Sequence, residues 1–540
     1  MKKLMRISLA LALGGAAYLA FCGAAFAATK VWTGGGADKK LSTAANWSDN
    51  AAPATGDVLS FGYVGPYTVV TVENDYDENT TFSGITFTND GTSGSTQSAT
   101  DGQWSTFTIT GNTLYLAATD GTSSVAISQP NRGYSAGRND AFKVPIVVKS
   151  SAGLTVTGKS RYGTMSFAES IDCGGGPLEI SSGFASVKGN IVNASAVIAK
   201  SLNWNSLVLD SKSVGTSIYS NRYGCVQIRH DSFAPETSFV LGDPAQQYNQ
   251  KDCGPAVIRL VADNASPADT SDVTLNGTLT LAKGYWNGSD GTGVFENNDS
   301  SRKLKLEFSD VTTDLDHILV LGGTGDGEAR FDVSTEDLRY FCLRKHGAGA
   351  WAVTGSIFSH LKVGQSTTRL HRVYDGTLAF TNTTVYANLM TYVGTNTTVG
   401  TVQNATLAGD ATFKGDVFVQ PGANVQGGWG EAFDTPLTVE GTLQMSNAVL
   451  RVAMNAEKTH VSSVKAATLD LGLANTIALP ASLKGLTPGN YTLLEWTTKK
   501  GEGTIALAED AALPAGAELV VGDNSIVLKY AKPGLVLIVR

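Results

Sequence analysis

The chain consists largely of short segments in which apolar and polar residues alternate. Alternation places every second side chain on one face of a β-strand, so each segment predicts a strand that is buried on one side. Many successive strands are roughly 20 to 30 residues apart, which is the period of a solenoid, and glycine or asparagine commonly precedes them. The segments are 114–116, 154–156, 178–180, 207–209, 226–228, 257–260, 279–281, 304–306, 378–380, 437–439 and 443–445.

The clearest repeat unit lies between Leu319 and Phe380. It contains a glycine-rich turn at 322–325 and two short strands at 351–353 and 377–380, each introduced by glycine. Neither strand buries its apolar face alone, so the unit needs neighbours stacked above and below it. The sequence therefore predicts an all-β fold, a β-solenoid in which Leu, Val and Ile side chains stack from turn to turn.

This unit resembles the autotransporter-associated β-strand repeat, which occurs in large exported bacterial proteins. Looser matches lie at 226–242 and 416–452, and the opening segment 32–62 is similar to the start of many such proteins. The resemblance implies a right-handed parallel β-helix that serves as an exported passenger, and it implies no catalytic residues. The matching positions are Gly322 to Gly325, Lys345, Gly347, Gly349, Trp351, Val353, Gly355, Gly376, Thr377 and Leu378.

The two ends of the chain differ from the repeat region. Residues 1–27 have a basic start, an apolar run and small residues before Ala27, which predicts a signal peptide. The alternative is a lipid anchor on Cys22, which the bulky Phe21 before it disfavours. We expect an N-terminal cap at 28–65, a β-helix repeat region at 66–460 and a β-rich C-terminal cap at 461–540. This tail predicts three strands, so we expect no C-terminal translocator barrel.

Composition and charge narrow the range of partners. Charged residues make up 16% of the chain, compared with about 25% in ordinary domains, and the net charge is −8. An acidic, charge-poor surface argues against nucleic acid and anionic lipid as partners. After the signal peptide no apolar run approaches 18 residues, so we expect no transmembrane segment. The eight tryptophans are dispersed, which favours caps and stacked ladders over sugar-binding platforms.

Cysteine spacing is compatible with one disulfide. Cys225 and Cys253 are close to one solenoid turn apart, and stacked turns would bring their Cα atoms to about 5 Å, within disulfide reach. The alternative is that both thiols pack as small hydrophobic groups. No Cys-x-x-Cys motif or neighbouring histidine pair occurs, so we expect no zinc, and we expect no cofactor.

Few motifs carry chemistry. Gly133 to Gly137 fits the Gly-x-Ser-x-Gly pattern, but prolines flank it where a nucleophile elbow needs a strand and a helix. Arg229, His230 and Asp231 are adjacent, so on a strand they would point to opposite faces and not converge. We expect a polar turn there. A wider set around it is the candidate ligand-contact region: Arg222, Tyr223, Arg229, His230, Asp231 and Tyr248.

The sequence favours a non-enzymatic exported scaffold, located in the periplasm, at the cell surface or outside the cell. Its loops would contact polysaccharide or other cell-surface or matrix components. One alternative is a β-helical polysaccharide lyase or glycoside hydrolase, and another is a lipid-anchored surface protein. Two or three carboxylates exposed on one sheet face across adjacent rungs would favour the enzyme. A face of threonine, serine and asparagine would favour the scaffold.

Overall fold

The protein is an all-β parallel β-helix, which confirms the predicted fold class. The sole helical element among the described residues is the 3-10 turn η1 (Ala44–Asn46). Contacts divide the chain into two compact units, Met1–Glu179 with Ile191–Ala194, and Ile180–Asn190 with Ser195–Arg540. The computed structural model describes residues 27–65, 68–88, 105–129, 139–158, 164–182, 185–201, 206–243, 255–262, 270–282, 291–313, 317–332, 341–359, 370–387, 390–395, 404–508, 513 and 515–531.

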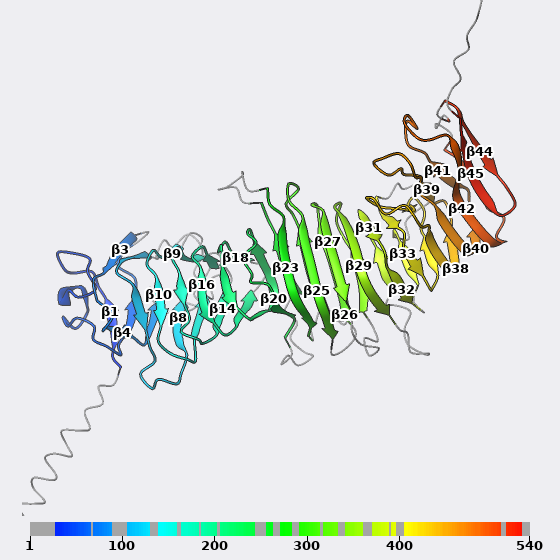
Figure 1. Cartoon of the computed structure of the whole chain (residues 1–540). Helices are drawn as coiled ribbons and strands as arrows, with labels where there is room; N and C mark the ends of the chain where they lie inside the picture. The colour runs from blue at the N-terminus through cyan, green and yellow to red at the C-terminus, as the bar shows by residue number, and fades with distance from the viewer. Residues whose placement is uncertain are drawn as a thin grey trace, which may run out of the picture. The chain divides into compact units, whose positions relative to one another are not determined.

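In the first unit each turn of the chain contributes strands to three parallel sheets, which we call A, B and C (Figure 1). Sheet A contains β1 (Thr29–Trp32), β2 (Val58–Phe61), β5 (Gly84–Phe87), β8 (Val125–Gln129) and β11 (Leu154–Gly158). Sheet B contains β3 (Thr68–Asn74), β6 (Ser105–Gly111), β9 (Asn139–Phe142) and β12 (Thr164–Phe167). Sheet C contains β4 (Thr81–Phe82), β7 (Leu114–Leu116), β10 (Ile146–Val148), β13 (Ile171–Asp172) and β16 (Ile191–Ala194).

Aromatic side chains stack inside this unit. Trp32 and Trp47 are buried and meet edge to face, with ring centroids 5.2 Å apart. Phe61 lies against both tryptophans and continues the stack into Phe87, whose ring centroid is 5.6 Å away. The two N-terminal tryptophans therefore belong to a buried ladder, as the sequence analysis favoured.

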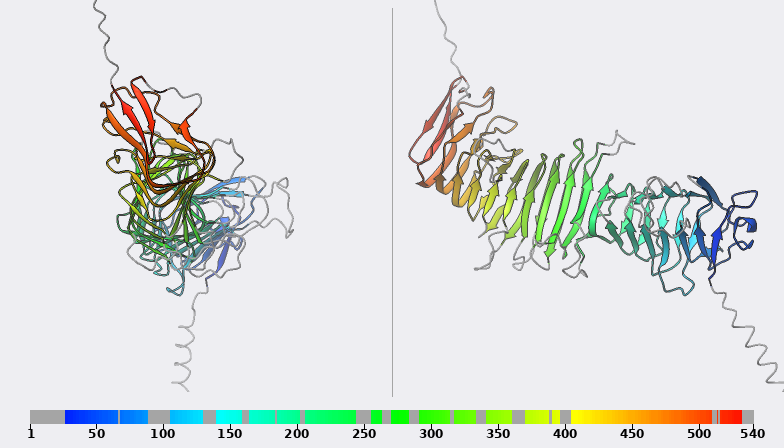
Figure 2. Two further views of the ribbon diagram at one scale, coloured as in Figure 1. Left: turned by 90° about the vertical axis from the view of Figure 1, so that its right-hand side faces the viewer. Right: turned by 180° about the vertical axis from the view of Figure 1, so that it is seen from behind.

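The second unit consists of stacked parallel strands, which Figures 1 and 2 show from two sides. Its sheet A contains β17 (Val197–Ser201), β20 (Ile218–Ile228), β21 (Thr237–Leu241), β23 (Val273–Leu281), β25 (Leu304–Thr313), β27 (Gly327–Asp332), β29 (Ala350–Ser359), β31 (Thr377–Phe380), β34 (Thr406–Gly409), β37 (Asn424–Val425), β39 (Val449–Arg451), β41 (Asn475–Ala478) and β43 (Ile505–Leu507).

Sheet B of the second unit includes the C-terminal half of β20, because that long strand bends from one sheet into the other. Its other strands are β15 (Ala185–Val187), β18 (Ser206–Leu209), β22 (Ala256–Leu260), β24 (Gly291–Asn297), β26 (His317–Gly323), β28 (Phe341–Lys345), β30 (His371–Val373), β33 (Thr391–Val393), β36 (Val417–Val419), β38 (Leu437–Met445), β40 (Val464–Leu471) and β42 (Gly489–Lys500). The strands β32 (Thr384–Ala387) and β35 (Thr412–Phe413) add a parallel row between β29 and β38.

The glycines of the repeat unit close its turns against one another. Gly323, Gly347 and Gly376 all have positive φ angles, of 100°, 77° and 67°. A Cβ atom on Gly347 would lie 2.4 Å from the Gly323 carbonyl oxygen, and one on Gly376 would lie 2.4 Å from the Gly347 carbonyl oxygen. A side chain at these corners would therefore be both strained and in collision with the neighbouring turn.

Trp351, the most prominent residue of the repeat, is completely buried. Its indole Nε1 donates a hydrogen bond to the Gly322 carbonyl at 3.1 Å. The ring covers Gly327, the residue in register on the preceding strand, where a Cβ atom would approach the indole to 2.5 Å. Trp351 is thus a core residue, and its partner position requires glycine.

The chain ends in antiparallel pairing. The strand β45 (Ser525–Tyr530) runs antiparallel to β42, and β44 (Ala517–Val521) runs antiparallel to β45. These are the three tail strands that the sequence predicts. Because β45 reverses the direction of pairing, the parallel stacking of sheet B ends on β42.

Candidate functional site

A groove of about 1140 Å³ lies over sheet A of the second unit. Its floor is formed by outward-facing residues of β25, β27 and β29, and one wall is the loop between β37 and β38. The groove therefore crosses several rungs, as an elongated ligand would need. Its charged and aromatic lining residues are Lys303, Lys305, Glu307, Phe308, Glu328, Arg330, Asp332, Asp410, Trp429, Glu431 and Asp434.

Opposite charges alternate on the floor because consecutive strands pair in register. Lys305 lies beside Glu328, and Glu307 lies beside Arg330. Most of these charges also form ion pairs at the edges of the floor. Lys303 Nζ is 2.6 Å from Glu328 Oε1, and Arg330 Nε is 2.9 Å from Asp332 Oδ2.

Lys305 also pairs with Asp272 at 2.9 Å. The Lys305 hydrogen bond lowers the pKa of the Asp272 carboxyl, and the same bond raises the pKa of Lys305. Glu307 is exposed and forms no ion pair with a described residue. Most charged side chains of the floor are therefore neutralised by ion pairs, and their hydrogen-bonding groups line the groove.

A tight loop presents Trp429 to the groove. The Trp429 and Ala432 backbone groups bond to each other in both directions, at 3.1 and 2.9 Å, which closes a hairpin tip. Gly430 at this tip has a φ of 58°, a conformation that favours glycine. The buried Phe433 anchors the loop, and its ring packs against Gly428. Trp429 itself is only half-buried, so part of the indole faces the groove.

Asp410 lies where the loop meets the rungs. Its Oδ1 accepts a hydrogen bond from the Asn382 backbone N–H at 2.8 Å, and Thr435 Oγ1 lies 3.4 Å from both its carboxylate and its carbonyl oxygen. These bonds fix the carboxylate in position. Asp410 therefore contributes an oriented acceptor to this end of the groove.

The region selected from the sequence lies elsewhere, around β20. Arg229 Nη1 and His230 Nε2 both contact the Asp210 carboxylate, at 3.1 and 3.2 Å. Two of the three neighbours therefore meet at Asp210, because β20 ends at Ile228 and strand alternation no longer applies. The prediction that all three do not converge on one substrate stays untested. The prediction of a polar turn at this position is confirmed.

The remaining residues of that region are separate from this turn. Arg222 is 3.7 Å from Asp243, and Tyr223 lies on the same strand. Burial raises the pKa of Asp231. Tyr248 lies outside the described residues. The structure therefore divides this region into structural ion pairs and places the groove further along the chain.

The disulfide prediction stays open. Cys225 pairs in register with Ser206 and Val257, and Cys253 lies outside the described residues. The Gly133–Gly137 motif and Cys22 also lie outside them. Within the described ranges, no three His, Cys, Asp or Glu side chains gather as metal ligands. Those ranges likewise contain no helix with the length and apolar character to span a membrane.

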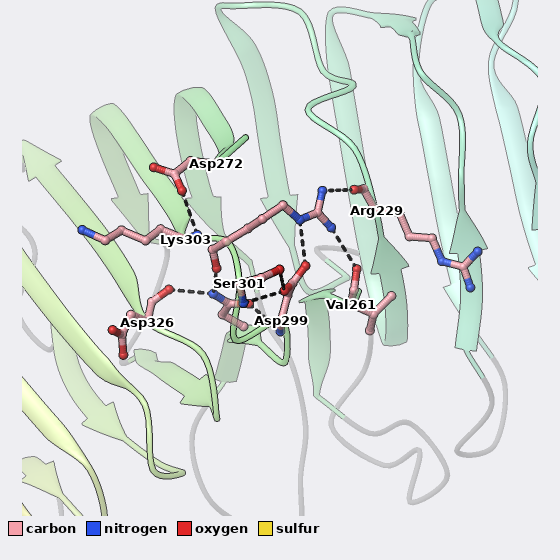
Figure 3. Close-up of polar contacts among 9 residues, drawn as sticks. Arg229, Val261, Asp272, Asp299, Ser301, Lys303 and Asp326 are labelled. Carbon is pink, nitrogen blue, oxygen red and sulfur yellow. Dashed lines mark hydrogen bonds and ion pairs between the residues drawn. The ribbon is translucent and has the colours of Figure 1, made fainter. Parts of the chain in front are cut away.

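A buried polar network joins three turns of the second unit (Figure 3). Arg302 and Asp299 form an ion pair at 2.7 Å, with their side chains 2% and 3% exposed. Arg302 also donates to the carbonyls of Arg229 and Val261, at 2.7 and 3.2 Å. Burial alone would raise the pKa of Asp299, but hydrogen bonds from Ser301 and Arg302 outweigh it, and the pKa is lowered. Each of the three Arg302 side-chain nitrogens has an internal partner, so the network stabilises the turns.

Sequence reasoning missed the groove because its residues are far apart in the chain. Lys303 and Asp434 are brought together only by the stacking of rungs and by one loop. One sequence pattern could have indicated the floor of the groove. The segments Lys303–Glu307 and Glu328–Asp332 place charges at alternate positions in consecutive strands, on the face that points outward. No protein-family model and no curated protein matches this chain.

Proposed function

We propose that this chain is an exported β-helical scaffold that binds an extended glycan in the groove over sheet A. The observation that carries the proposal is the groove itself, with its ion-paired floor and the half-buried Trp429 in its wall. Export rests on the signal-like segment at residues 1–27 and on the resemblance to autotransporter-associated repeats. Binding of a glycan is one of the roles that this class of scaffold suggests.

The lining suits the chemistry of sugars. A sugar ring presents C–H groups on its faces and hydroxyls on its edges, so an aromatic side chain and fixed hydrogen-bonding groups bind it together. Trp429 supplies the aromatic side chain, and the floor and Asp410 supply the fixed hydrogen-bonding groups. Because the lining has six carboxylates and three cations, it disfavours an acidic glycan. The ligand that fits best is a neutral polysaccharide.

A binding experiment tests this function. Residues 28–540 would be screened on an array of neutral and acidic glycans, and the affinity of the best neutral oligosaccharide would be measured by calorimetry. Trp429→Ala should weaken binding about tenfold, which corresponds to about 1.4 kcal/mol. Tyr491→Ala removes a partly exposed aromatic residue outside the groove and should leave the affinity unchanged. Absence of neutral-glycan binding, or equal affinity of the Trp429 variant, would contradict the proposal.

One observation favours a second function, cleavage of the bound polysaccharide. Glu307 and Glu328 lie on adjacent rungs of one sheet face, two positions and one strand apart. Strand spacing and rise put their Cα atoms about 8 Å apart. This arrangement meets the criterion set for an enzyme, although Glu328 is bound to Lys303.

An assay for new reducing or unsaturated ends separates the two functions. If the groove is catalytic, wild-type protein should release saccharide from the glycan that it binds, and Glu307→Gln should abolish release while retaining binding. Glu495→Gln, on β42 and outside the groove, is the matched control and should remain active. Binding without release would reject the enzyme and leave the scaffold.

A further inference from the structure

Sheet B of the second unit carries an unusual column of outward side chains. Along this column Val320 is in register with Arg344, and Arg344 is in register with Arg372. The next two strands place Tyr392 and then Phe418 at the same position. We call Arg344, Arg372, Tyr392 and Phe418 the arginine column. All four side chains are half-buried, so each retains contact with solvent.

Aromatic rings fix one end of the arginine column. The Arg372 guanidinium lies 5.3 Å from the Tyr374 ring centroid and 5.2 Å from that of Tyr392. The Tyr392 ring stacks in turn on Phe418, with centroids 4.9 Å apart and planes inclined by 12°. Arg372 is therefore oriented by cation–π contacts instead of by a carboxylate.

The two arginines have like charges, and neither forms an ion pair with an acidic residue in the part of the chain that the structure describes. Neighbouring parallel strands lie about 4.8 Å apart, and like charges directly opposite each other are destabilising. The Nε atoms of Arg344 and Arg372 are buried and find no hydrogen-bond acceptor among the described residues. Of the acids near this surface, Glu296 is bound to Arg259 at 2.5 Å, and Asp375 accepts a bond from the Gly376 N–H.

A histidine, His346, adjoins the arginine column. His346 stacks on Tyr374, with ring centroids 4.3 Å apart. Burial is the main cause that lowers the pKa of His346, and the charges of Arg344 and Lys345 lower it further. The charges of Glu296 and Asp375 act in the opposite direction and raise this pKa, so the charges around His346 are mixed.

We infer that Arg344 and Arg372 form a binding site for an oxyanion, a carboxylate or a sulfate, carried on an acidic polysaccharide. Guanidinium groups bind such oxygens through paired, charge-assisted hydrogen bonds, and a bound anion would relieve the repulsion between the two arginines. The aromatic rings of Tyr392 and Phe418 lie beside the site, where they contact the attached sugar. This site is distinct from the groove over sheet A, whose excess of carboxylates repels the same ligand.

The remainder of the column favours a polysaccharide over a nucleic acid. Beyond Phe418 the same position is occupied by Gln444 and then by Asp470, so the positive surface ends there. Nucleic-acid binding depends on neutralising many successive phosphates, and the net charge of the chain is −8. Two arginines with adjoining aromatic rings match one or two charged groups on a sugar chain.

Calorimetry with defined oligomers tests the inference. Purified residues 28–540 would be titrated with oligogalacturonate, sulfated dextran oligomers, neutral dextran and single-stranded DNA. We expect one acidic oligosaccharide to bind, and the arm that binds identifies carboxylate or sulfate. Arg344→Gln and Arg372→Gln should each weaken this binding about tenfold or more. Arg451→Gln makes the same change of charge at an exposed position on sheet A and should leave the affinity unchanged.

Two further measurements keep the test independent of folding defects. Arg372→Lys retains the charge but loses the planar fork, so it should weaken binding of the acidic oligomer while the thermal unfolding midpoint is unchanged. The acidic oligomer should also raise the midpoint of the wild-type protein. The inference is overturned if neither acidic oligosaccharide binds, if Arg451→Gln weakens binding equally, or if single-stranded DNA binds more tightly.

Discussion

The second unit uses arginine in two contrasting ways, in the network around Arg302 and in the arginine column. Arg302 is 2% exposed, and it is bound to Asp299 and to two backbone carbonyls. Arg344 and Arg372 lie at the surface of sheet B, Arg372 lies beside two tyrosine rings, and the buried Nε atoms of both have no hydrogen-bond partner among the described residues. A buried guanidinium whose three nitrogens all bond to internal acceptors stabilises the fold, whereas a surface guanidinium without an ion pair to a described residue is suited to a ligand.

The largest expected effect comes from removing a partner of the buried arginine. Asp299→Ala leaves the Arg302 charge buried and unpaired, so it should reduce the free energy of unfolding by about 3–5 kcal/mol. Urea denaturation followed by circular dichroism measures this loss. Asp332→Ala breaks the exposed pair with Arg330 and should cost about 0–1 kcal/mol. Equal losses in the two variants would show that the Arg302 network is not a special stabilising element.

An intermediate effect is expected from the interior directly behind the arginine column. His371, next to Arg372 on β30, is completely buried, and its Nδ1 accepts a hydrogen bond from the Leu343 N–H. Burial lowers the pKa of His371 to about 4 from its usual 6.5. Between these values the unfolded chain binds a proton that the folded chain does not, so stability falls as the pH falls from about 6.5 to about 4.

The pH dependence due to His371 changes the free energy of unfolding by at most about 3 kcal/mol. We expect the free energy of unfolding to be lower at pH 4.5 than at pH 7, and the difference to be smaller in His371→Asn. The control His460→Asn replaces an exposed histidine and should retain the full difference. An unchanged pH dependence in His371→Asn would mean that the core behind the arginine column is accessible to protons.

The smallest expected effect is on the arginine column itself. Without a ligand, Arg344→Gln removes a repulsion between like charges, so the free energy of unfolding should stay constant or rise by up to about 1 kcal/mol. Urea denaturation in low salt would measure it, with Arg451→Gln as the reference. A loss of more than about 1 kcal/mol would indicate that Arg344 has a stabilising role like that of Arg302, which would remove the contrast.

The fold was predictable because its signal is local. Alternating segments such as 279–281 and 378–380 specify which face of each strand is buried, and the structure places both in parallel strands. The corner glycines were also predictable, since Gly347 and Gly376 each require a conformation that other residues rarely adopt.

The candidate sites were not predictable because they depend on register between distant strands. Arg344 and Arg372 are 28 positions apart and become neighbours only through the pairing of β28 with β30. Glu307 and the Trp429 loop line the same groove only because several rungs stack between them. Because the spacing between successive strands varies along the chain, the sequence does not show which outward residues of two rungs align. The candidate residues around β20 were therefore chosen from their composition alone.

The corner formed by Gly323, Gly347 and Gly376 has a consequence for engineering. Each glycine touches the carbonyl of the turn before it, so this corner accepts changes in whole rungs and resists single insertions. Excising the rung between Gly347 and Gly376 would shorten the solenoid by one strand spacing, about 4.8 Å, and would remove Arg372 while leaving Arg344. The length of the solenoid is therefore adjustable in steps of one strand, and this particular excision would separate the contribution of Arg344 from that of Arg372.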